Sequence, residues 1–397
     1  MIAGPNIYKV VLPLSKSIAA RRLILDYIYR RDNDVITLPE CDDTRELSSA
    51  ILQLRSHPKG DGLNFDLGSG GTSFRFFVAL VASLPDFEGR IDCSDLLRNR
   101  PLLPLIEALR SAGAEIIFEG NAPTPPLIIK GKRLSAKDLK VDTTLSTQFA
   151  SAIAMASLLW EKPWRPRIIS GMPSSPYLKM TLQMIDDAQV GVFPEIEADW
   201  SAASYFYEYT LLNPGVKIIL EGLKPQRASL QGDARCKEIF AGLGVNTSWR
   251  DDGSAVISCE TPRVNQVHIN MSETPDLVPA LAVALCGAGI PFTLSGIANL
   301  RVKESDRVAS LCSELGRFGY RLKADKESIS YSGTPDFIRQ PKCLDSHGDH
   351  RIAMCMAVLS KSLYRGGIIG KIPMIRGAEA VSKSYPGFFE DLRRLNL

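Results

Sequence analysis

The stretch LPLSKSIAARRLIL, residues 12–25, places Lys16 between Ser15 and Ser17, directly before an apolar run. Burying an ammonium group without a partner is costly, so a lysine at the start of a largely buried helix indicates that an anion binds there. The N–H groups and partial positive charge of a helix start also favour phosphate or carboxylate. The sequence therefore predicts an anion-binding site at Lys16.

Polar or cationic residues precede several other expected helices in both halves of the chain. They occur at Arg100 and in GSGGTSFR (68–75), STQ (146–148), SSPY (174–177), ADWS (198–201), ETPD (273–276), KESDR (303–307), GDHR (348–351) and SKSY (382–385). If the buried helices pack side by side, these starts are grouped. The pattern then favours a cleft between domains that binds more than one anionic group.

Each motif alone has a simpler interpretation. Ser, Thr and Asp before a helix are common N-caps. GSGG is compatible with an ordinary turn, because Ser73 stands where GxGxxG requires its third glycine and the Walker lysine is missing. The two histidines of HGDH, residues 347–350, have no acidic or cysteine partner at ligand spacing, so we expect no metal site.

The composition is that of an ordinary globular protein and excludes several classes. The 397 residues allow two or three domains, and 47 Lys and Arg against 44 Asp and Glu give a net charge of +3. We therefore expect neither nucleic acid nor a membrane surface as partner. Eight scattered cysteines without a CxxC pair indicate a reduced intracellular chain. We see no signal peptide and no apolar run of membrane-spanning length, so we expect a cytoplasmic protein.

Twelve helices are expected, in strict alternation of two kinds. Helices that are apolar nearly all round, and hence buried, are expected at 17–29, 71–84, 147–160, 201–212, 274–289 and 349–364. Amphipathic helices are expected at 42–54, 100–112, 176–189, 232–243, 305–318 and 386–395. Short β-branched runs between them, DVITL, EIIFE, LIIK, RIIS, KIILEG, AVISC and FTLSG, are typical of strands. The pattern predicts two similar α/β domains, each with three repeats, that meet at EIEADW, residues 195–200.

The chain resembles the 5-enolpyruvylshikimate-3-phosphate synthase family along its whole length. The matching motifs are, in order, LSKSIAARR, CDDT, LGSGGTSFR, RNRP, STQF, SSPY, EADWSAASYF, QGDARC, PDLVPALA, NLRVKESDR, DHRIAMCM and SKSYPGFF. The resemblance implies the enolpyruvyl transferase fold, an inside-out α/β barrel in which each domain has three βαβαββ repeats. The domains would be 14–199 and 1–13 plus 200–397, with the active site in the cleft between them.

The resemblance also implies a reaction, in which the enolpyruvyl group of phosphoenolpyruvate is transferred to the 5-hydroxyl of shikimate 3-phosphate and phosphate is released. It implies a monomer with small-molecule substrates and with no metal or organic cofactor. Asp276 would take the proton from the 5-hydroxyl, and Glu304 and Lys16 would supply the remaining acid–base steps. Fixed positive charge would stabilise the leaving phosphate.

The family's binding residues carry over to matching positions of this chain. Those for phosphoenolpyruvate would be Lys16, Arg100 and Lys383 at its phosphate, Gly71 beside it, Arg307 and Arg351 at its carboxylate, and Gln148 between both substrates. Those for shikimate 3-phosphate would be Lys16, Ser17, Arg21 at its carboxylate, Ser146, Thr147, Ser174 and Lys303 at its phosphate, and Gln148, Tyr177, Asp276 and Asn299.

Five positions depart from the family pattern. Leu14 and Ala198 replace glycines, Ala20 and Ser69 replace asparagines, and Thr147 replaces a serine. Because serine and threonine keep a hydroxyl, we expect these changes to alter affinity and to leave the reaction in place.

Other functions remain open as alternatives. UDP-N-acetylglucosamine 1-carboxyvinyltransferase has the same fold and chemistry, but the RNRP segment here lacks a cysteine. A non-catalytic relative that binds an anionic metabolite would not need Asp276 and Glu304. A helical repeat scaffold for proteins would favour an aromatic binding face over cations at helix starts.

Overall fold

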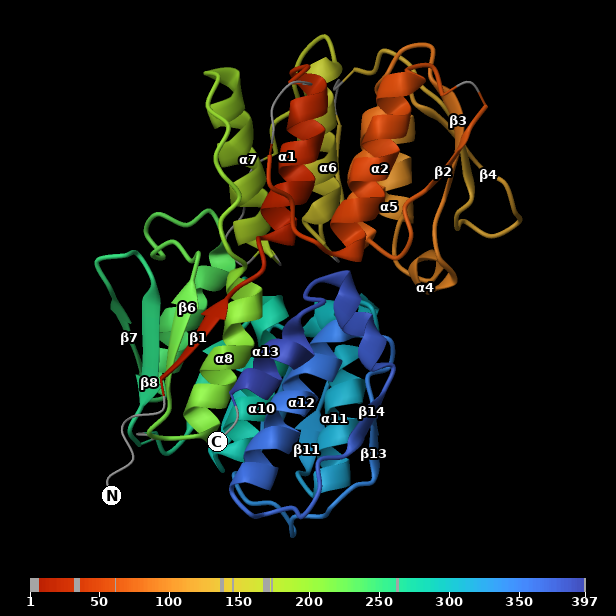
Figure 1. Ribbon diagram of the computed structural model, residues 1–397. Coiled ribbons are helices and arrows are strands. Elements are labelled where there is room, and N and C mark those ends of the chain that lie inside the picture. Colours follow the sequence, from red (N-terminus) through yellow and green to blue (C-terminus); the bar gives the residue numbers. More distant parts are fainter. Residues whose placement is uncertain are drawn as a thin grey trace. The chain divides into compact units, whose positions relative to one another are not determined.

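The computed structural model describes residues 7–31, 36–60, 62–135, 139–144, 146–166, 172, 174–261 and 264–395 (Figure 1). The chain divides into two compact units. One is discontinuous, Met1–Leu14 with Glu197–Leu397, and the other, Ser15–Ile196, is inserted into it. The names discontinuous unit and inserted unit are used below.

A four-stranded sheet with one fixed topology occurs three times. In the discontinuous unit the sheet orders are β1-β6-β8-β7 and β9-β10-β12-β11, and in the inserted unit the order is β2-β3-β5-β4. In each sheet order the first two strands are parallel. The third strand pairs antiparallel with the second, and the fourth pairs antiparallel with the third. The bounds are β1 Ile7–Val11, β2 Asn64–Asp66, β3 Glu88–Asp92, β4 Glu115–Phe118, β5 Leu127–Lys130, β6 Lys217–Glu221, β7 Val245–Trp249, β8 Ala255–Cys259, β9 Val267–Asn270, β10 Phe292–Ser295, β11 Leu322–Ala324 and β12 Ser328–Tyr331.

Helices between these strands complete the βαβαββ order in each of the three. Within the described residues, a fourth sheet in the discontinuous unit consists of the parallel pair β13 (Cys343–Asp345) and β14 (Met374–Arg376). The expected strands EIIFE, LIIK, KIILEG, AVISC and FTLSG are confirmed as β4, β5, β6, β8 and β10. RIIS lies outside the described residues, as does the first part of DVITL, and the described remainder of DVITL, residues 36–38, is not a strand.

All twelve expected helices are confirmed, with shifted ends. The helices are α1 Lys16–Ile28, α2 Asp42–Ser56, α3 Gly71–Ala82, α5 Leu103–Ser111, α6 Gln148–Ala156, α7 Ser175–Gln189, α8 Trp200–Leu212, α9 Cys236–Gly242, α10 Val278–Gly287, α11 Arg307–Phe318, α12 His350–Arg365 and α13 Phe388–Arg394. The short helix α4, Asp95–Arg98, was not expected. The described part of the chain also has five 3-10 segments: η1 Ser157–Leu159, η2 Gly232–Arg235, η3 Pro275–Leu277, η4 Ala298–Val302 and η5 Ala378–Lys383.

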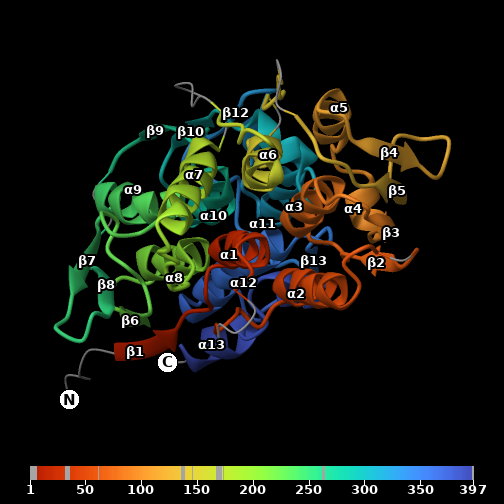
Figure 2. The same cartoon turned by 90° about the horizontal axis from the view of Figure 1, so that it is seen from above.

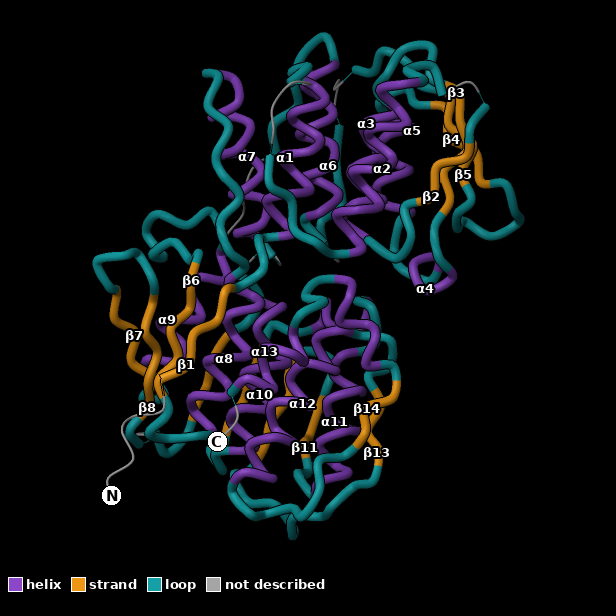
Figure 3. Tube along the Cα trace, viewed as in Figure 1, coloured by secondary structure: helices purple, strands orange, loops and turns teal. Residues whose placement is uncertain are grey.

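The prediction that helices apolar all round form the core is confirmed. Every residue of α10 from Val278 to Cys286 is buried, and so is every residue of α8 from Trp200 to Leu211. In the discontinuous unit α8, α10 and α12 pack against one another, with the sheets outside them (Figure 2). The strands lie at the periphery of this unit and the helices inside (Figure 3). The expected fold class, a mixed α/β fold with buried helices and outer sheets, is confirmed.

Side-chain capping occurs at only some of the helix starts. Among the described helices, Asp199, Asp306 and Asp349 cap α8, α11 and α12 by accepting backbone N–H groups. Ser15, at the start of α1, makes no such cap, and neither does Ser174 at α7. Capping therefore explains the three aspartates but not the serines.

Candidate active site

Arg307, the first residue of α11, lies at the centre of a cluster of charges in the discontinuous unit. Its side chain is 1% exposed. Nε donates to Asp349 Oδ2 at 2.7 Å, one terminal nitrogen donates to Asp276 Oδ1 at 2.9 Å, and the other to Glu304 Oε2 at 2.7 Å. One guanidinium thus fixes three carboxylates that come from three separate segments of the chain.

Asp276, the residue we expect to be the base, lies in η3 just before the buried helix α10. Besides Arg307 it contacts Arg351 at 3.0 Å and Lys303 at 3.7 Å. Burial raises the pKa of Asp276, but the positive charges of Arg351, Lys303 and Arg307 outweigh it and hold the pKa well below its usual range. Asp276 is therefore ionised and able to accept a proton.

Glu304, one of the two residues expected to act as acid and base at the enol carbon, connects Arg307 with a further cation. Its Oε1 lies 3.3 Å from Lys383 Nζ, and its Oε2 accepts from Arg307. Lys383 comes from the end of η5 and is buried. Asn299, in η4, is also buried. The structure thus brings together six of the residues expected in this unit, namely Asp276, Lys303, Glu304, Arg307, Arg351 and Lys383.

Asp349 was not singled out from the sequence, yet it organises this cluster. Its side chain is fully buried. Oδ2 accepts from Arg307 Nε at 2.7 Å, and Oδ1 accepts from the backbone N–H of Arg351 at 2.9 Å, which caps α12. Asp349 therefore holds one expected carboxylate-binding arginine directly and positions the helix start that carries the other. Its place in GDHR, before a buried helix, was the available signal.

A second buried carboxyl group, that of Asp233 in η2, also lies near Asp276. It accepts a hydrogen bond from Ser201 Oγ. Burial, together with the negative charge of Asp276, raises the pKa of Asp233 to about 6. Two neighbouring carboxyl groups with pKa values pushed apart are typical of sites that handle protons.

In the inserted unit, Lys16 begins α1 and pairs with an acid from the CDDT motif. Its Nζ lies 2.8 Å from Asp43 Oδ2. The Lys16 side chain is 18% exposed and the Asp43 side chain 5% exposed. The lysine predicted to meet an anion thus holds one from the protein itself, and Asp43 is a residue that the sequence analysis did not single out.

Arg21 is deeply buried in α1, with its guanidinium largely occupied by the protein. Its nitrogens donate to Thr181 Oγ1 at 2.7 Å, to the Ser17 carbonyl at 2.7 Å and to the Tyr177 carbonyl at 3.0 Å. Burial lowers the pKa of Arg21 to about 10. Three of its five N–H groups therefore bind other described residues of the fold, which makes Arg21 in part a structural residue.

Gly71 opens α3 where two arginines approach it. A Cβ at this position would lie 2.6 Å from an Arg100 nitrogen and 3.0 Å from an Arg75 nitrogen. Arg75 in turn donates to Gln148 Oε1 at 2.6 Å and to the Pro101 carbonyl at 2.8 Å. Arg100 precedes α5, which begins at Leu103; the expected helix start at Arg100 is therefore wrong, because Pro101 and the turn after α4 come first.

Five residues expected to bind shikimate 3-phosphate lie at two helix starts, namely Ser146, Thr147, Gln148, Ser174 and Tyr177. Thr147 Oγ1 donates to the Ser174 carbonyl at 2.9 Å, and Ser146 Oγ accepts from the Gln148 backbone N–H at 3.2 Å. Ser174 has a left-handed backbone, φ 56°, immediately before α7, whose first turn carries Tyr177. The start of α6 is thereby joined to the start of α7.

The structure also describes two positions that depart from the family pattern and the two histidines of HGDH. Leu14 and Ala198, two of the positions that depart from the family, form an isolated antiparallel bridge with each other. His347 Nε2 lies 3.0 Å from Glu314 Oε1, while His350 is buried in α12. Within the described part of the chain, no helix has the length and apolarity needed to cross a membrane.

Comparison with known proteins places this arrangement in a family. The fold of two units built from βαβαββ repeats matches the solved structure of EPSP synthase from Acinetobacter baumannii, with a TM-score of 0.69, 20% identity, and coverage of 99% of this chain and 96% of that one. The sequence profile described as EPSP synthase (3-phosphoshikimate 1-carboxyvinyltransferase) matches residues 7–195 and 190–392. The chain belongs to the EPSP synthase family.

Curated relatives resemble the chain over nearly its full length. A protein of Bacteroides fragilis named 3-phosphoshikimate 1-carboxyvinyltransferase is 31% identical, over 99% of this chain and 97% of its own. Proteins with the same name from Syntrophobacter fumaroxidans and Methanospirillum hungatei are 32% and 30% identical, over 97% and 99% of this chain and 96% of their own. The resemblance seen in the motifs is therefore confirmed.

Proposed function

We propose that this protein is an enzyme that transfers the enolpyruvyl group of phosphoenolpyruvate to the 5-hydroxyl of shikimate 3-phosphate. This is the step of the shikimate pathway that leads towards chorismate and the aromatic amino acids. The observation that carries the proposal is the Arg307 cluster, in which four cations meet two carboxylates suited to proton transfer in a member of the EPSP synthase family. The names of the curated relatives support the same reaction.

The reaction has two balanced steps. The 5-hydroxyl oxygen bonds to the enol carbon of phosphoenolpyruvate, its proton passes to a base, and the methylene carbon gains a proton. The methyl group so formed then loses a proton, the carbon–oxygen bond to phosphate breaks, and the enol ether remains. A base, an acid and fixed positive charge are needed within one site.

We assign the groups of the discontinuous unit as follows. Asp276 is the base for the 5-hydroxyl, since its ionised carboxylate is held by three cations. Arg307 and Arg351 bind the carboxylate of phosphoenolpyruvate, because their guanidinium groups suit bidentate pairing. Glu304 supplies the proton at the methylene carbon, and Lys383, 3.3 Å from it, binds the phosphate. Lys303 and Asn299 contact shikimate 3-phosphate.

The inserted unit supplies the rest. Lys16, Arg100, Gln148 and Gly71 meet phosphoenolpyruvate, with Lys16 also protonating the leaving group. Shikimate 3-phosphate is bound by Lys16, Ser17, Arg21, Ser146, Thr147, Gln148, Ser174 and Tyr177.

Because the two sets of residues lie in different units, the proposal requires the domains 14–199 and 1–13 plus 200–397 to close over the substrates. A smaller radius of gyration on adding shikimate 3-phosphate supports closure; an unchanged value contradicts it.

The reaction itself is tested by measuring phosphate released from phosphoenolpyruvate by the purified protein. We expect release with shikimate 3-phosphate and none with UDP-N-acetylglucosamine. Release with the second acceptor alone would assign the chain to the other enolpyruvyl transfer reaction. No release with either acceptor from folded protein would refute the proposal. We propose further that the enzyme is a cytoplasmic monomer. Gel filtration with light scattering tests the oligomeric state.

A further inference from the structure

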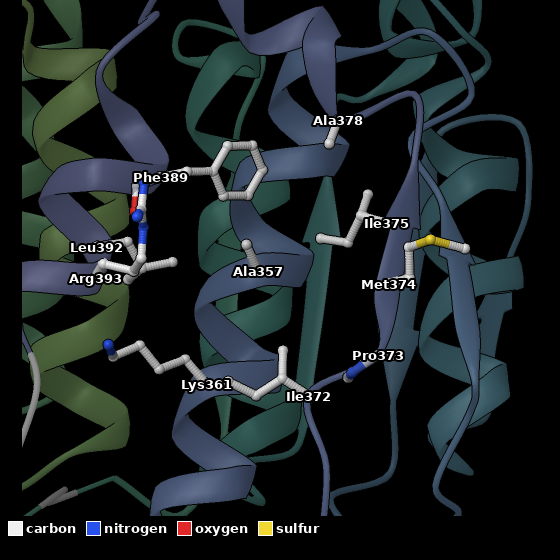
Figure 4. Close-up of a pocket in the computed structure, with 10 residues that line it drawn as sticks. All are labelled: Ala357, Lys361, Ile372, Pro373, Met374, Ile375, Ala378, Phe389, Leu392 and Arg393. Carbon is white, nitrogen blue, oxygen red and sulfur yellow. The ribbon is translucent and has the colours of Figure 1, made fainter.

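A pocket of about 420 Å³ lies in the discontinuous unit and shares no residue with the Arg307 cluster. Its walls come from α12, from the segment that enters and forms β14, from η5 and from α13 (Figure 4). Ten residues line it: Ala357, Lys361, Ile372, Pro373, Met374, Ile375, Ala378, Phe389, Leu392 and Arg393. Eight of these ten are uncharged, so the pocket is a mainly apolar one of ordinary ligand-binding size.

The repeat that contains the pocket is incomplete. In the three four-stranded sheets the second strand pairs with an antiparallel strand on its free edge, as β10 does with β12. β14 holds the corresponding second place, but within the described residues it pairs with β13 alone. Beside it, Ile372 and Met374 are 43% and 68% exposed. The apolar side chains of Ile372 and Met374 are thus exposed beside the pocket that they help to line.

The charged residues of the lining are both basic. Lys361 extends from α12 toward the side of the pocket on which Arg393 lies, and Ile375 lies on the opposite side (Figure 4). Arg393 Nε donates to the Phe389 carbonyl at 3.4 Å, and this guanidinium forms no ion pair with any described residue. Burial and the nearby charge of Arg365 lower the pKa of Lys361. An anion on the Arg393 side of the pocket would pair with the Arg393 guanidinium.

We propose that this pocket binds a small amphipathic carboxylate, with its apolar body against Ile372, Ile375 and Phe389 and its carboxylate at Lys361 and Arg393. The combination of an apolar hollow with two cations on one side recognises such a molecule and disfavours neutral or cationic compounds of the same shape. The apolar body supplies affinity through buried area, and the cations fix its orientation.

This site is separate from the proposed active site, although one helix carries residues of both. Arg351 lies in the first turn of α12, and Lys361 lies ten residues further along it. At about 1.5 Å per residue the two are about 15 Å apart along the helix. The pocket therefore adds a second ligand site on the far half of a helix whose start belongs to the Arg307 cluster, and binding there does not depend on the proposed reaction.

The test uses two probes of equal size, 4-phenylbutanoate and 4-phenylbutanamide, titrated calorimetrically into the full-length protein. We expect the carboxylate to bind at least about tenfold more tightly than the amide, a difference of about 1.4 kcal/mol. Lys361→Met keeps the apolar stem and removes the charge, so it should remove most of that preference. Met374→Glu, at an exposed position, should weaken carboxylate binding by charge repulsion. Lys326→Met, an exposed lysine between β11 and β12, is the matched control.

Thermal unfolding of each variant establishes that it is folded before the titrations are compared. Equal affinity for the two probes would overturn the proposal, since the cations would then play no part. Unchanged affinity in both Lys361→Met and Met374→Glu would place the probe elsewhere and overturn it as well. Absence of binding of either probe to the unmodified protein would also refute it.

Discussion

Glu208, in the middle of α8, gives a prediction whose size can be worked out. Its side chain is 0% exposed, and neither carboxyl oxygen has a hydrogen-bond partner among the described residues. Burial raises the pKa of Glu208 well above its ordinary value of 4.5. An ionised carboxylate in such a place would lack both water and a counter-charge, so the folded protein keeps Glu208 protonated.

The sign of the effect follows from proton counting. Above about pH 4.5 the unfolded chain ionises Glu208 while the folded chain keeps the proton, so unfolding releases one proton. The contribution of Glu208 to stability is complete below its unfolded pKa and is lost as the pH rises towards its folded pKa. Within that window the free energy of unfolding falls by about 1.4 kcal/mol for each pH unit on account of this one group.

Glu208→Gln has nearly the same size and does not titrate, so it isolates this term. We expect the difference in unfolding free energy between the unmodified protein and Glu208→Gln to change by about 1.4 kcal/mol between about pH 5.5 and about pH 6.5, in favour of the variant at higher pH. Glu208→Leu, which also cannot ionise but cannot hydrogen-bond, is the control and should share the pH slope of Glu208→Gln.

The assay is urea unfolding followed by tryptophan fluorescence. A Trp160→Phe, Trp164→Phe background leaves Trp200 and Trp249, both in the discontinuous unit, as the reporters. This restriction matters because a chain of two units need not unfold in one step. A pH-independent difference between the unmodified protein and Glu208→Gln would refute the reasoning, because Glu208 would then be ionised in the fold.

Three further predictions concern the candidate site. Asp276→Asn should lower kcat by about 10²–10⁴-fold while leaving shikimate 3-phosphate binding measurable by calorimetry, and near-normal kcat would remove its role as base. Lys16→Met should raise the KM for phosphoenolpyruvate, because it removes a phosphate contact; unchanged steady-state kinetics would contradict the assignment. Asp349→Asn should destabilise the discontinuous unit by about 1.5–3 kcal/mol through weakened charge-assisted bonds to Arg307, measured by urea unfolding, and should also raise the KM for phosphoenolpyruvate. An effect on stability without any effect on KM would show that Asp349 does not position Arg307 for substrate.

Local patterns in the sequence predicted the helices well, because a helix that is buried on all sides has apolar side chains on all sides. Apolar runs such as PALAVALC in α10 have no other stable place than a core. The first residue of a helix is harder to predict from the sequence. A helix was expected to start at Arg100, but α5 begins at Leu103 because a turn follows α4. The sheet topology followed only from the repeat and the family resemblance.

The contacts within the site could not be predicted from sequence spacing. Arg307 and Asp349 are 42 positions apart, and their bond depends on how α11 packs beside α12. The burial of Arg21 depends on Thr181, 160 positions away. Sequence motifs identified which side chains carry charge, but only packing decides which charges neutralise one another.

The pairing of charges in the discontinuous unit bears directly on the proposed chemistry. Four cations, Lys303, Arg307, Arg351 and Lys383, pair directly with three carboxylates, Asp276, Glu304 and Asp349. Buried cations that bind an anionic substrate need carboxylate partners before the substrate binds, because an unpaired buried charge is strongly destabilising.

The same pairing holds the pKa of Asp276 well below its usual range, which makes it a weak base in the free protein. On the proposed assignment, the substrate carboxylate takes a share of Arg307 and Arg351 and brings a negative charge close to Asp276. Both changes raise the pKa of Asp276, so the base gains proton affinity only when phosphoenolpyruvate is in place. On this assignment, binding of phosphoenolpyruvate makes Asp276 a stronger base. Asp349 stays paired with Arg307 on its buried side and keeps the guanidinium in position while the other partners of Arg307 change.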